Sequence, residues 1–363
     1  DLSVPTVTKM VGELIDDGIV MDFGKIETSG GRRPNIYGLN QSSGYFIGID
    51  ICHSHVNIGV TDFKGELISE ELSIPFTESQ PQERFQRLCE IINQFIHKSK
   101  VPKHKILSMG INISGRVNTL TGHSYSSFYF DERPLTEMFE NELNINVSID
   151  NDSRAMTYGE YIKGCVNGEK NVLYVNVSWG LGLGIIVGGQ LYYGKSGFSG
   201  EFGHIPAFGN EILCHCGKKG CLETEASGLA LHRKFLEKLH SGHSSLLTQK
   251  SGYNPNAPIS LNDIIEVALQ EDMLAIELIE EIGNSLGKHI AGLINLFNPE
   301  LVVIGGTLAY AGDYLMLPLR SAIRKYSLNL VSKDSTIKVS KLGEKAGLLG
   351  ASLLARSKFI GLI

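Results

Sequence analysis

The chain has 363 residues, of which 42% are hydrophobic, and its formal net charge is −6. This length is enough for two or three domains with their own cores, and the negative charge excludes a global basic field that would draw the protein to nucleic acid. Any DNA contact must therefore come from a local patch. The six cysteines do not form the framework of a secreted disulfide-rich protein, so we predict a reducing, cytoplasmic compartment.

Residues 1–40 predict a helix followed by a hairpin. Ser3 can cap the helix and Pro5 is tolerated in its first turn. Strands are expected at 19–23 and 36–39, on either side of the tip Gly30-Gly31-Arg32-Arg33-Pro34. Apolar side chains recur on one face at helical spacing, which supports the helix: Val7, Val11, Leu14 and Ile15.

A helix, a hairpin and a basic glycine-rich tip form the second half of a winged helix-turn-helix. Its helix would enter the major groove, and its wing would reach phosphates or the minor groove. The residues expected to contact operator DNA are Ser3, Thr6, Lys9, Arg32 and Arg33. Because the chain starts inside this motif, we expect its N-terminal part to be missing. The alternative is a small α/β cap without a DNA role, since the segment also carries several acidic residues.

After a polar linker at 40–43, the next hundred residues predict an α/β lobe. Strands are expected at 45–50, 56–62 and 106–113, with a helix at 81–98. Another strand ends at Asp150-Asn151-Asp152 and leads into a helix. Ligands bind at the carboxyl ends of strands in α/β sheets, so this is a candidate site. Helix capping by the same residues is the alternative, and both can be true.

The remaining residues predict a second lobe. The uncharged run 171–194 is long enough to suggest a membrane span, but five glycines interrupt it, so we expect strands and turns and no membrane insertion. We take 241–258 as a surface excursion. Helices are expected at 231–239, 261–269, 273–297 and 347–359, and a buried strand at 301–304.

Thiols and an imidazole cluster between Gly200 and Glu223. His204 precedes Cys214-His215-Cys216-Gly217 and Gly220-Cys221. The glycines let the backbone double back, and three sulfurs with one nitrogen complete a tetrahedral structural Zn²⁺ site. We predict that His204, Cys214, Cys216 and Cys221 bind zinc, and that His215 points outward. The alternatives are reduced thiols without metal, or a disulfide.

The pattern Glu-x-Gly-His followed by Cys-x-Cys-Gly-x-x-Gly-Cys-x-Glu resembles the signature of the ROK family of repressors, open reading frames and sugar kinases. The helix start Pro-Thr-Val-Thr and the wing Gly-Gly-Arg-Arg-Pro resemble those of its repressors. The resemblance implies an α/β actin/hexokinase-like fold of two lobes, a duplicated ribonuclease H-like domain. The expected parts are a partial winged helix-turn-helix at 1–40, a first lobe at 45–149 completed by the C-terminal helix 346–363, and a second lobe with the zinc knuckle at 150–345.

The resemblance also implies a sugar site beside the zinc. The matched sugar ligands are Asn151, Asp152, Glu201, His204 and Glu223, and His204 would reach the metal with one nitrogen and the sugar with the other. In the family's kinases the residue matched by Asp152 is the general base of phosphoryl transfer. The sugar loop around 126–130 departs from the kinase pattern, so the sugar cannot be named.

The phosphate-binding turn of the kinases, Asp-x-Gly-Gly-Thr, departs from that pattern here. Cys52 and His53 replace its two glycines, which would obstruct the nucleotide, although the turn could still bind phosphate in another shape. Trp179 opens a glycine run that resembles the second phosphate loop, but tight strand turns explain that run equally well. The candidate nucleotide residues are Asp50, Ser54, Gly182, Gly184, Gly305 and Gly306.

Two functions therefore compete. The first is a dimeric or tetrameric transcriptional repressor that binds operator DNA and responds to a sugar or sugar phosphate. The second is an ATP- and Mg²⁺-dependent sugar kinase with an incidental N-terminal cap. The predicted wing and the lost glycines favour the repressor, and we expect phosphorylation to be slow or absent.

Overall fold

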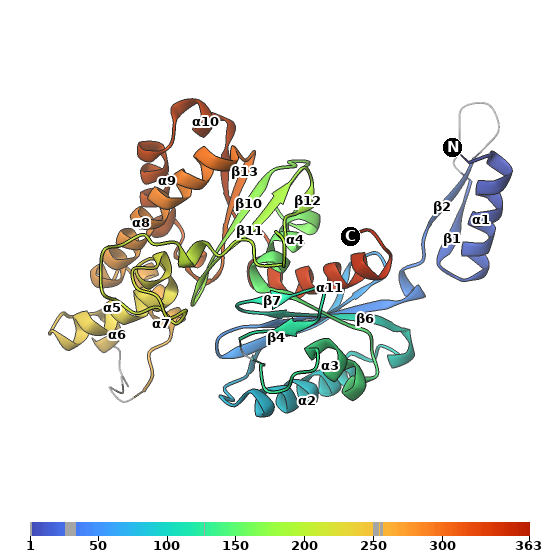
Figure 1. Ribbon diagram of the computed structural model, residues 1–363, viewed down its shortest axis with the longest axis horizontal. Helices are drawn as coiled ribbons and strands as arrows, with labels where there is room; N and C mark the ends of the chain where they lie inside the picture. The colour runs from blue at the N-terminus through green and yellow to red at the C-terminus, as the bar shows by residue number, and fades with distance from the viewer. Residues whose placement is uncertain (1, 26–33, 127, 250–253, 255–256) are drawn as a thin grey trace. The chain divides into compact units, whose positions relative to one another are not determined.

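The structure is a computed structural model that describes residues 2–25, 34–126, 128–249, 254 and 257–363 (Figure 1). The chain divides into two compact units, the first made of residues 1–150 and 351–363, and the second of residues 151–350. Within the described residues, no helix is long and apolar enough to cross a membrane.

The N-terminal segment contains the predicted helix and hairpin. Helix α1 (Val4–Asp16) starts at Ser3, whose side chain accepts a hydrogen bond from the Thr6 N–H, and ends before Gly18, which has a φ of +72°. Strands β1 (Val20–Lys25) and β2 (Asn35–Leu39) pair antiparallel. The expected wing residues Arg32 and Arg33 lie outside the described residues.

The apolar face of α1 is only partly covered in the described structure. No residue of α1 is buried, and the side chains of Val7 and Leu14 are 45% and 39% exposed. The reason is that β1 alone among the described elements packs closely along this helix, so only part of its apolar face is covered.

A five-stranded sheet in the order β5-β4-β3-β6-β9 forms the centre of the first unit, with antiparallel β3–β4 and β4–β5 pairs and a parallel β3–β6 pair. The strands are β3 (Tyr45–Ile51), β4 (His55–Asp62), β5 (Leu67–Pro75), β6 (Ile106–Ile113) and β9 (Val147–Asn151). Around them lie α2 (Pro81–Ser99), α3 (Leu135–Leu143), the 3-10 turns η1 (Gln41–Ser43) and η2 (Lys103–Lys105), and the ribbon β7 (Val117–Asn118) and β8 (His123–Ser124). The expected linker at 40–43 is thus partly a helical turn.

The second unit repeats this topology with the order β12-β11-β10-β13-β14. In both sheets the first three strands form an antiparallel meander and the fourth pairs parallel with the first. The strands are β10 (Val172–Val177), β11 (Leu181–Val187), β12 (Gln190–Leu191), β13 (Leu301–Gly305) and β14 (Thr336–Val339). The repeated strand order is that of a duplicated domain, and the expectation of strands rather than a membrane helix in 171–194 is confirmed.

The second unit contains the helices α4 (Asp152–Lys163), α5 (Gly228–His240), α6 (Leu246–Gln249), α7 (Leu261–Leu269), α8 (Met273–Phe297), α9 (Asp313–Tyr326) and α10 (Asn329–Asp334), with the 3-10 turns η3 (Phe202–His204), η4 (Leu222–Thr224), η5 (Thr307–Ala311) and η6 (Gly343–Lys345). Of these helices, α5, α7, α9 and α10 pack against the long helix α8, while α4 packs against β10 and β11. The predicted bounds of α7 and α8 are confirmed. The stretch 241–258 is not wholly a surface excursion, because buried Ser245 donates a 2.7 Å hydrogen bond to Asp272 and anchors α6.

The last helix, α11 (Ala346–Phe359), contributes to both units through glycine contacts and polar contacts. In the first unit, the Ser352 and Thr61 hydroxyls lie 2.5 Å apart, and Arg356 Nε donates to the Phe63 carbonyl at 2.7 Å. In the second unit, Gly350 packs directly on the backbone carbonyl of Ala155 in α4. The absence of a Cβ at Gly350 permits this close approach of two helices.

Replacing Gly350 with alanine tests this contact. A Cβ there would collide with the Ala155 carbonyl, so we expect Gly350→Ala to lower the free energy of unfolding by about 1–3 kcal/mol. Gly292→Ala in α8 is the matched control, because it has open space around it and should be stabilising by up to about 1 kcal/mol. Urea unfolding of both variants measures the two changes in the free energy of unfolding. Equal stabilisation by the two substitutions would contradict the close contact of Gly350 with the Ala155 carbonyl.

Candidate functional site

A turn that contains Gly217 and Gly220 brings together the cysteine side chains of the knuckle (residues 204–223). The Cys214 N–H donates to the Lys218 carbonyl at 2.8 Å, and the Gly217 N–H donates back to the Cys214 carbonyl at 2.9 Å. Gly217 and Gly220 have φ angles of +84° and +70°, which side-chain-bearing residues rarely adopt. The turn therefore depends on glycine at both positions.

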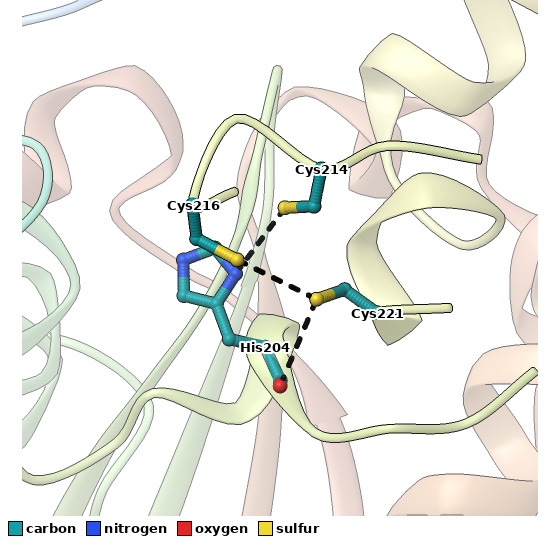
Figure 2. A group of neighbouring side chains, drawn as sticks. All are labelled: His204, Cys214, Cys216 and Cys221. Atoms are coloured by element: carbon teal, nitrogen blue, oxygen red, sulfur yellow. Dashed lines mark hydrogen bonds between the residues drawn. The ribbon is translucent and has the colours of Figure 1, made fainter. Parts of the chain in front are cut away.

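The four predicted metal ligands converge (Figure 2). One ligand atom from each of His204, Cys214, Cys216 and Cys221 lies within 4.8 Å of the others. His204 Nδ1 is 3.5 Å from Cys214 Sγ, and the sulfurs of Cys216 and Cys221 are 3.6 Å apart. That separation is far longer than a disulfide and close to the roughly 3.8 Å edge of a tetrahedron with zinc–sulfur bonds of about 2.3 Å. The donor set fits zinc.

Burial makes a thiolate costly here unless a cation compensates for it. It raises the pKa of Cys214 to about 12, and the nearby Glu223 carboxylate acts in the same direction. Zn²⁺ would offset the negative charge of the sulfurs, which would also be its ligands.

Glu223 is a buried carboxylate held at both oxygens. Oε2 accepts a 2.9 Å hydrogen bond from the Leu181 N–H, and Oε1 lies 3.0 Å from Nδ1 of His215. Burial raises its pKa, but the hydrogen bonds from His215 and Leu181 outweigh that effect, so the pKa lies below its usual value. Gly180 leaves room for the carboxylate, since a Cβ there would lie 2.8 Å from Oε2. Glu223 is thus an oriented anion.

His204 faces two groups with its two ring nitrogens. Nδ1 points toward Cys214, while Nε2 lies 3.7 Å from Glu201 Oε2. Turn η3, whose Phe202 is buried, fixes both Glu201 and His204 on one short segment. The geometry is compatible with the predicted double role, in which one nitrogen binds metal and the other faces the sugar ligands.

Asn151 and Asp152 cap helix α4. Asn151 Oδ1 accepts from the N–H groups of Ser153 and Arg154 at 3.1 and 3.2 Å, and Asp152 Oδ1 accepts from the Ser153 N–H at 2.7 Å. The capping interpretation therefore holds for these oxygens. Strand β11 lies next to both parts of the site, because Leu181 binds Glu223 and the adjacent Gly182 packs on Ser153.

Sequence reasoning missed two residues near this site. Buried Arg154 donates from Nη1 to the Gly197 carbonyl at 2.7 Å and lies 5.2 Å from the Tyr193 ring, so it anchors the loop that precedes Glu201. His215 was expected to point outward. Its side chain is 66% exposed, yet Nδ1 turns back to Glu223. No local sequence signal revealed either contact.

Gly182 and Gly184 of the predicted second phosphate loop have a packing role in the structure, and their part in a nucleotide site stays a prediction. Both lie within strand β11, where a Cβ would collide with Ser153 or Thr157 of α4, so they permit close packing of strand and helix. Gly305 ends β13 against the Tyr174 ring, and Gly306 has a φ of +85° in the following turn.

The other nucleotide candidates, Asp50 and Ser54, belong to the first unit. Asp50 is buried at the end of β3, and Ser54 is exposed in the turn to β4. Cys52 Sγ lies 3.6 Å from Asp50 Oδ2 and 3.9 Å from Asn57 Nδ2. The thiol therefore packs against the carboxylate, at a position where the kinase pattern has glycine and leaves space.

The described residues that are expected to contact DNA, Ser3, Thr6 and Lys9, are exposed. Ser3 Oγ lies 2.8 Å from Thr6 Oγ1 as part of the cap, and Lys9 Nζ is 3.8 Å from Glu13 on the same exposed face. This geometry leaves the N-terminal half of α1 accessible.

Comparison with known proteins identifies the chain. The ROK family model matches residues 46–358. The chain belongs to the ROK family. The xylose repressor of Caldicellulosiruptor bescii is 30% identical over 99% of this chain and 90% of its own length.

Two solved structures support the same assignment. A ROK family transcriptional regulator, described as a homologue of the Escherichia coli MLC protein, is 27% identical with a TM-score of 0.81 and covers 99% of this chain and 90% of its own. A ROK glucokinase from Streptomyces griseus, solved with glucose and AMPPNP, is 29% identical with a TM-score of 0.77 and covers 86% of this chain and all of its own. The fold is thus the predicted actin/hexokinase-like one, and the xylose repressor and the transcriptional regulator described above each match 99% of this chain.

Proposed function

We propose that this ROK-family transcriptional regulator represses transcription by binding operator DNA through α1 and its wing, and that a sugar or sugar phosphate bound in the second unit changes that binding. The observation that carries the proposal is the presence of an exposed α1–β1–β2 segment together with sugar-ligand candidates, Glu201, His204 and Glu223, in or beside a Cys₃His cluster. The similarity to xylose repressors over 99% of the chain supports it.

DNA contact would use local positive charge. The chain has a net charge of −6, so attraction to phosphates must come from Lys9 on α1 and from the wing arginines Arg32 and Arg33. Ser3 and Thr6 lie at the start of the same helix, where side chains of a recognition helix meet base edges or phosphates. The chain would act as a homodimer or homotetramer on an operator with matching two-fold symmetry.

A structural zinc ion would hold the knuckle together. The donor set of His204, Cys214, Cys216 and Cys221 supports zinc over a hard cation, because thiolates and imidazole are soft or borderline ligands. All four positions of a tetrahedron would be filled by protein atoms, so the metal would organise the site rather than activate water. It would fix Glu201 and Glu223 relative to His204.

The sugar would be recognised through its hydroxyl groups. Glu223 presents a carboxylate acceptor within the knuckle and Glu201 presents one just before it, and Asn151 and Asp152 lie at the start of α4 next to β11. Hydroxyls donate to carboxylates, which favours a polyhydroxy ligand. Binding would regulate transcription only if it stabilises one conformation over another.

An ATP-dependent sugar kinase remains the second candidate. The observation that favours it is Asp152, which matches the general base of the family's kinases, together with the similarity to the Streptomyces griseus glucokinase. The turn that binds phosphate in the family's kinases argues against a kinase here, because the Cys52 thiol packs on Asp50. Phosphoryl transfer depends mainly on positioning the nucleotide and its Mg²⁺, so this obstruction would be costly to catalysis.

Metal analysis tests the zinc proposal. We expect about one zinc per chain in the purified protein, and a large loss of zinc together with lower thermal stability in Cys221→Ser, because three remaining ligands cannot close the site. Cys165→Ser is the control and should retain the metal. A native protein without zinc, or with a Cys216–Cys221 disulfide, would refute the proposal.

Salt-dependent binding to the protein's own promoter region tests DNA recognition. Each lost phosphate contact should reduce the slope of log K against log salt by about 0.9, so Arg32→Ala with Arg33→Ala should reduce it by about 2. Lys238→Ala, an exposed lysine of α5, should change nothing. The regulator proposal fails if native protein shows no preference for this promoter over random DNA.

Sugar binding and phosphorylation can be measured on the same preparations. We expect calorimetry to detect binding of a neutral sugar such as xylose or of its phosphate, and a coupled assay with ATP to show turnover far below the usual kinase range of about 1–100 s⁻¹. Turnover within that range, abolished by Asp152→Asn, would instead establish the kinase.

A further inference from the structure

His215 occupies a rigid place in the knuckle. It lies between Cys214 and Cys216, two of the four candidate metal ligands, and backbone hydrogen bonds from Cys214 to Lys218 and from Gly217 to Cys214 close the turn around it. Its backbone is therefore held on both sides.

The imidazole meets the two central groups of the sugar site. Nδ1 lies 3.0 Å from Glu223 Oε1, and the ring stands edge-on to His204 with centroids 5.1 Å apart. Its side chain is 66% exposed, whereas that of Glu223 is 8% exposed. The ring thus lies between the solvent and a buried carboxylate.

The two oxygens of Glu223 are held by different means. Oε2 accepts from the Leu181 N–H, so strand β11 fixes it. Oε1 faces His215 at 3.0 Å and Cys214 Sγ at 3.9 Å, and at hydrogen-bonding distance the imidazole is its stronger partner. The rotation of the carboxylate about its terminal bond, and hence the direction of its acceptor lone pairs, depends on Leu181 at one oxygen and on His215 at the other.

We infer that His215 is a positioning residue of the effector site, which aims the Glu223 carboxylate at a hydroxyl group of a neutral sugar and joins the knuckle to that carboxylate. The inference rests on the proposed sugar site. A hydrogen-bond donor at the Nδ1 position is the property that matters. The other grouping of possible metal ligands around this residue, His204 with His215 and Glu223, shares His204 with the cysteine cluster and so is not an independent metal site.

Calorimetric titration of zinc-loaded protein with a panel of neutral aldoses, including xylose, tests the role. His215→Ala removes the donor and should weaken binding of the recognised sugar about tenfold to hundredfold, the usual effect of losing a hydrogen bond to a charged group. His215→Asn carries an amide near the Nδ1 position and should restore affinity to within about threefold of native. Lys218→Ala, an exposed residue of the same turn, is the matched control and should bind as native does.

Zinc content is measured for every variant, and it should stay at the native level, because His215 is not one of the four donors. A second readout is the ¹⁵N spectrum of the imidazoles, which should show His215 with a proton on Nδ1 and a changed signal in Glu223→Gln. A purely structural effect of the substitution would not be rescued by asparagine.

The outcomes separate the inference from the proposed function. If native protein binds a sugar and His215→Ala binds it equally well, the role of His215 is refuted while the sugar site stands. A proton on Nε2 alone would likewise refute the pairing with Glu223. If native protein binds none of the sugars, the proposed sugar site fails, and the inference fails with it.

Discussion

The convergence of three thiols and one imidazole in a single turn is the constraint on which the candidate site depends. Gly217 and Gly220 allow the turn, and the sulfurs of Cys216 and Cys221 reach 3.6 Å. Crowding buried thiolates is unfavourable without a cation, so the fold of this segment and the proposed zinc are linked. Because Glu201, His204 and Glu223 lie on or beside the same segment, the proposed metal would set the geometry of sugar recognition without contacting the sugar.

The rest of the second unit supports this segment through close backbone packing. Gly182 and Gly184 let β11 lie against α4, and Leu181 of the same strand donates to Glu223. Arg154, one turn into α4, reaches the Gly197 carbonyl and anchors the loop before Glu201. Strand β11 therefore connects α4, which begins at Asn151 and Asp152, with Glu223. Arg154 connects the same helix with the loop before Glu201.

Sequence reasoning succeeded where structure is local. The spacing of the cysteines predicted their convergence, apolar periodicity predicted α7 and α8, and Ser3 predicted the start of α1. It failed where the answer depends on a distant partner. The glycine run did not reveal that Gly182 and Gly184 pack against α4. The contact of His215 with Glu223 and that of Arg154 with the Gly197 carbonyl also depend on tertiary neighbours.

The most direct test of this account is a crystal structure of the protein with its recognised sugar, with anomalous diffraction collected at the zinc absorption edge. The account predicts one anomalous peak bound by His204 Nδ1 and by the sulfurs of Cys214, Cys216 and Cys221. It also predicts sugar hydroxyls within hydrogen-bonding distance of Glu201 and Glu223. A sugar bound away from these carboxylates, or a knuckle without an anomalous peak, would contradict it.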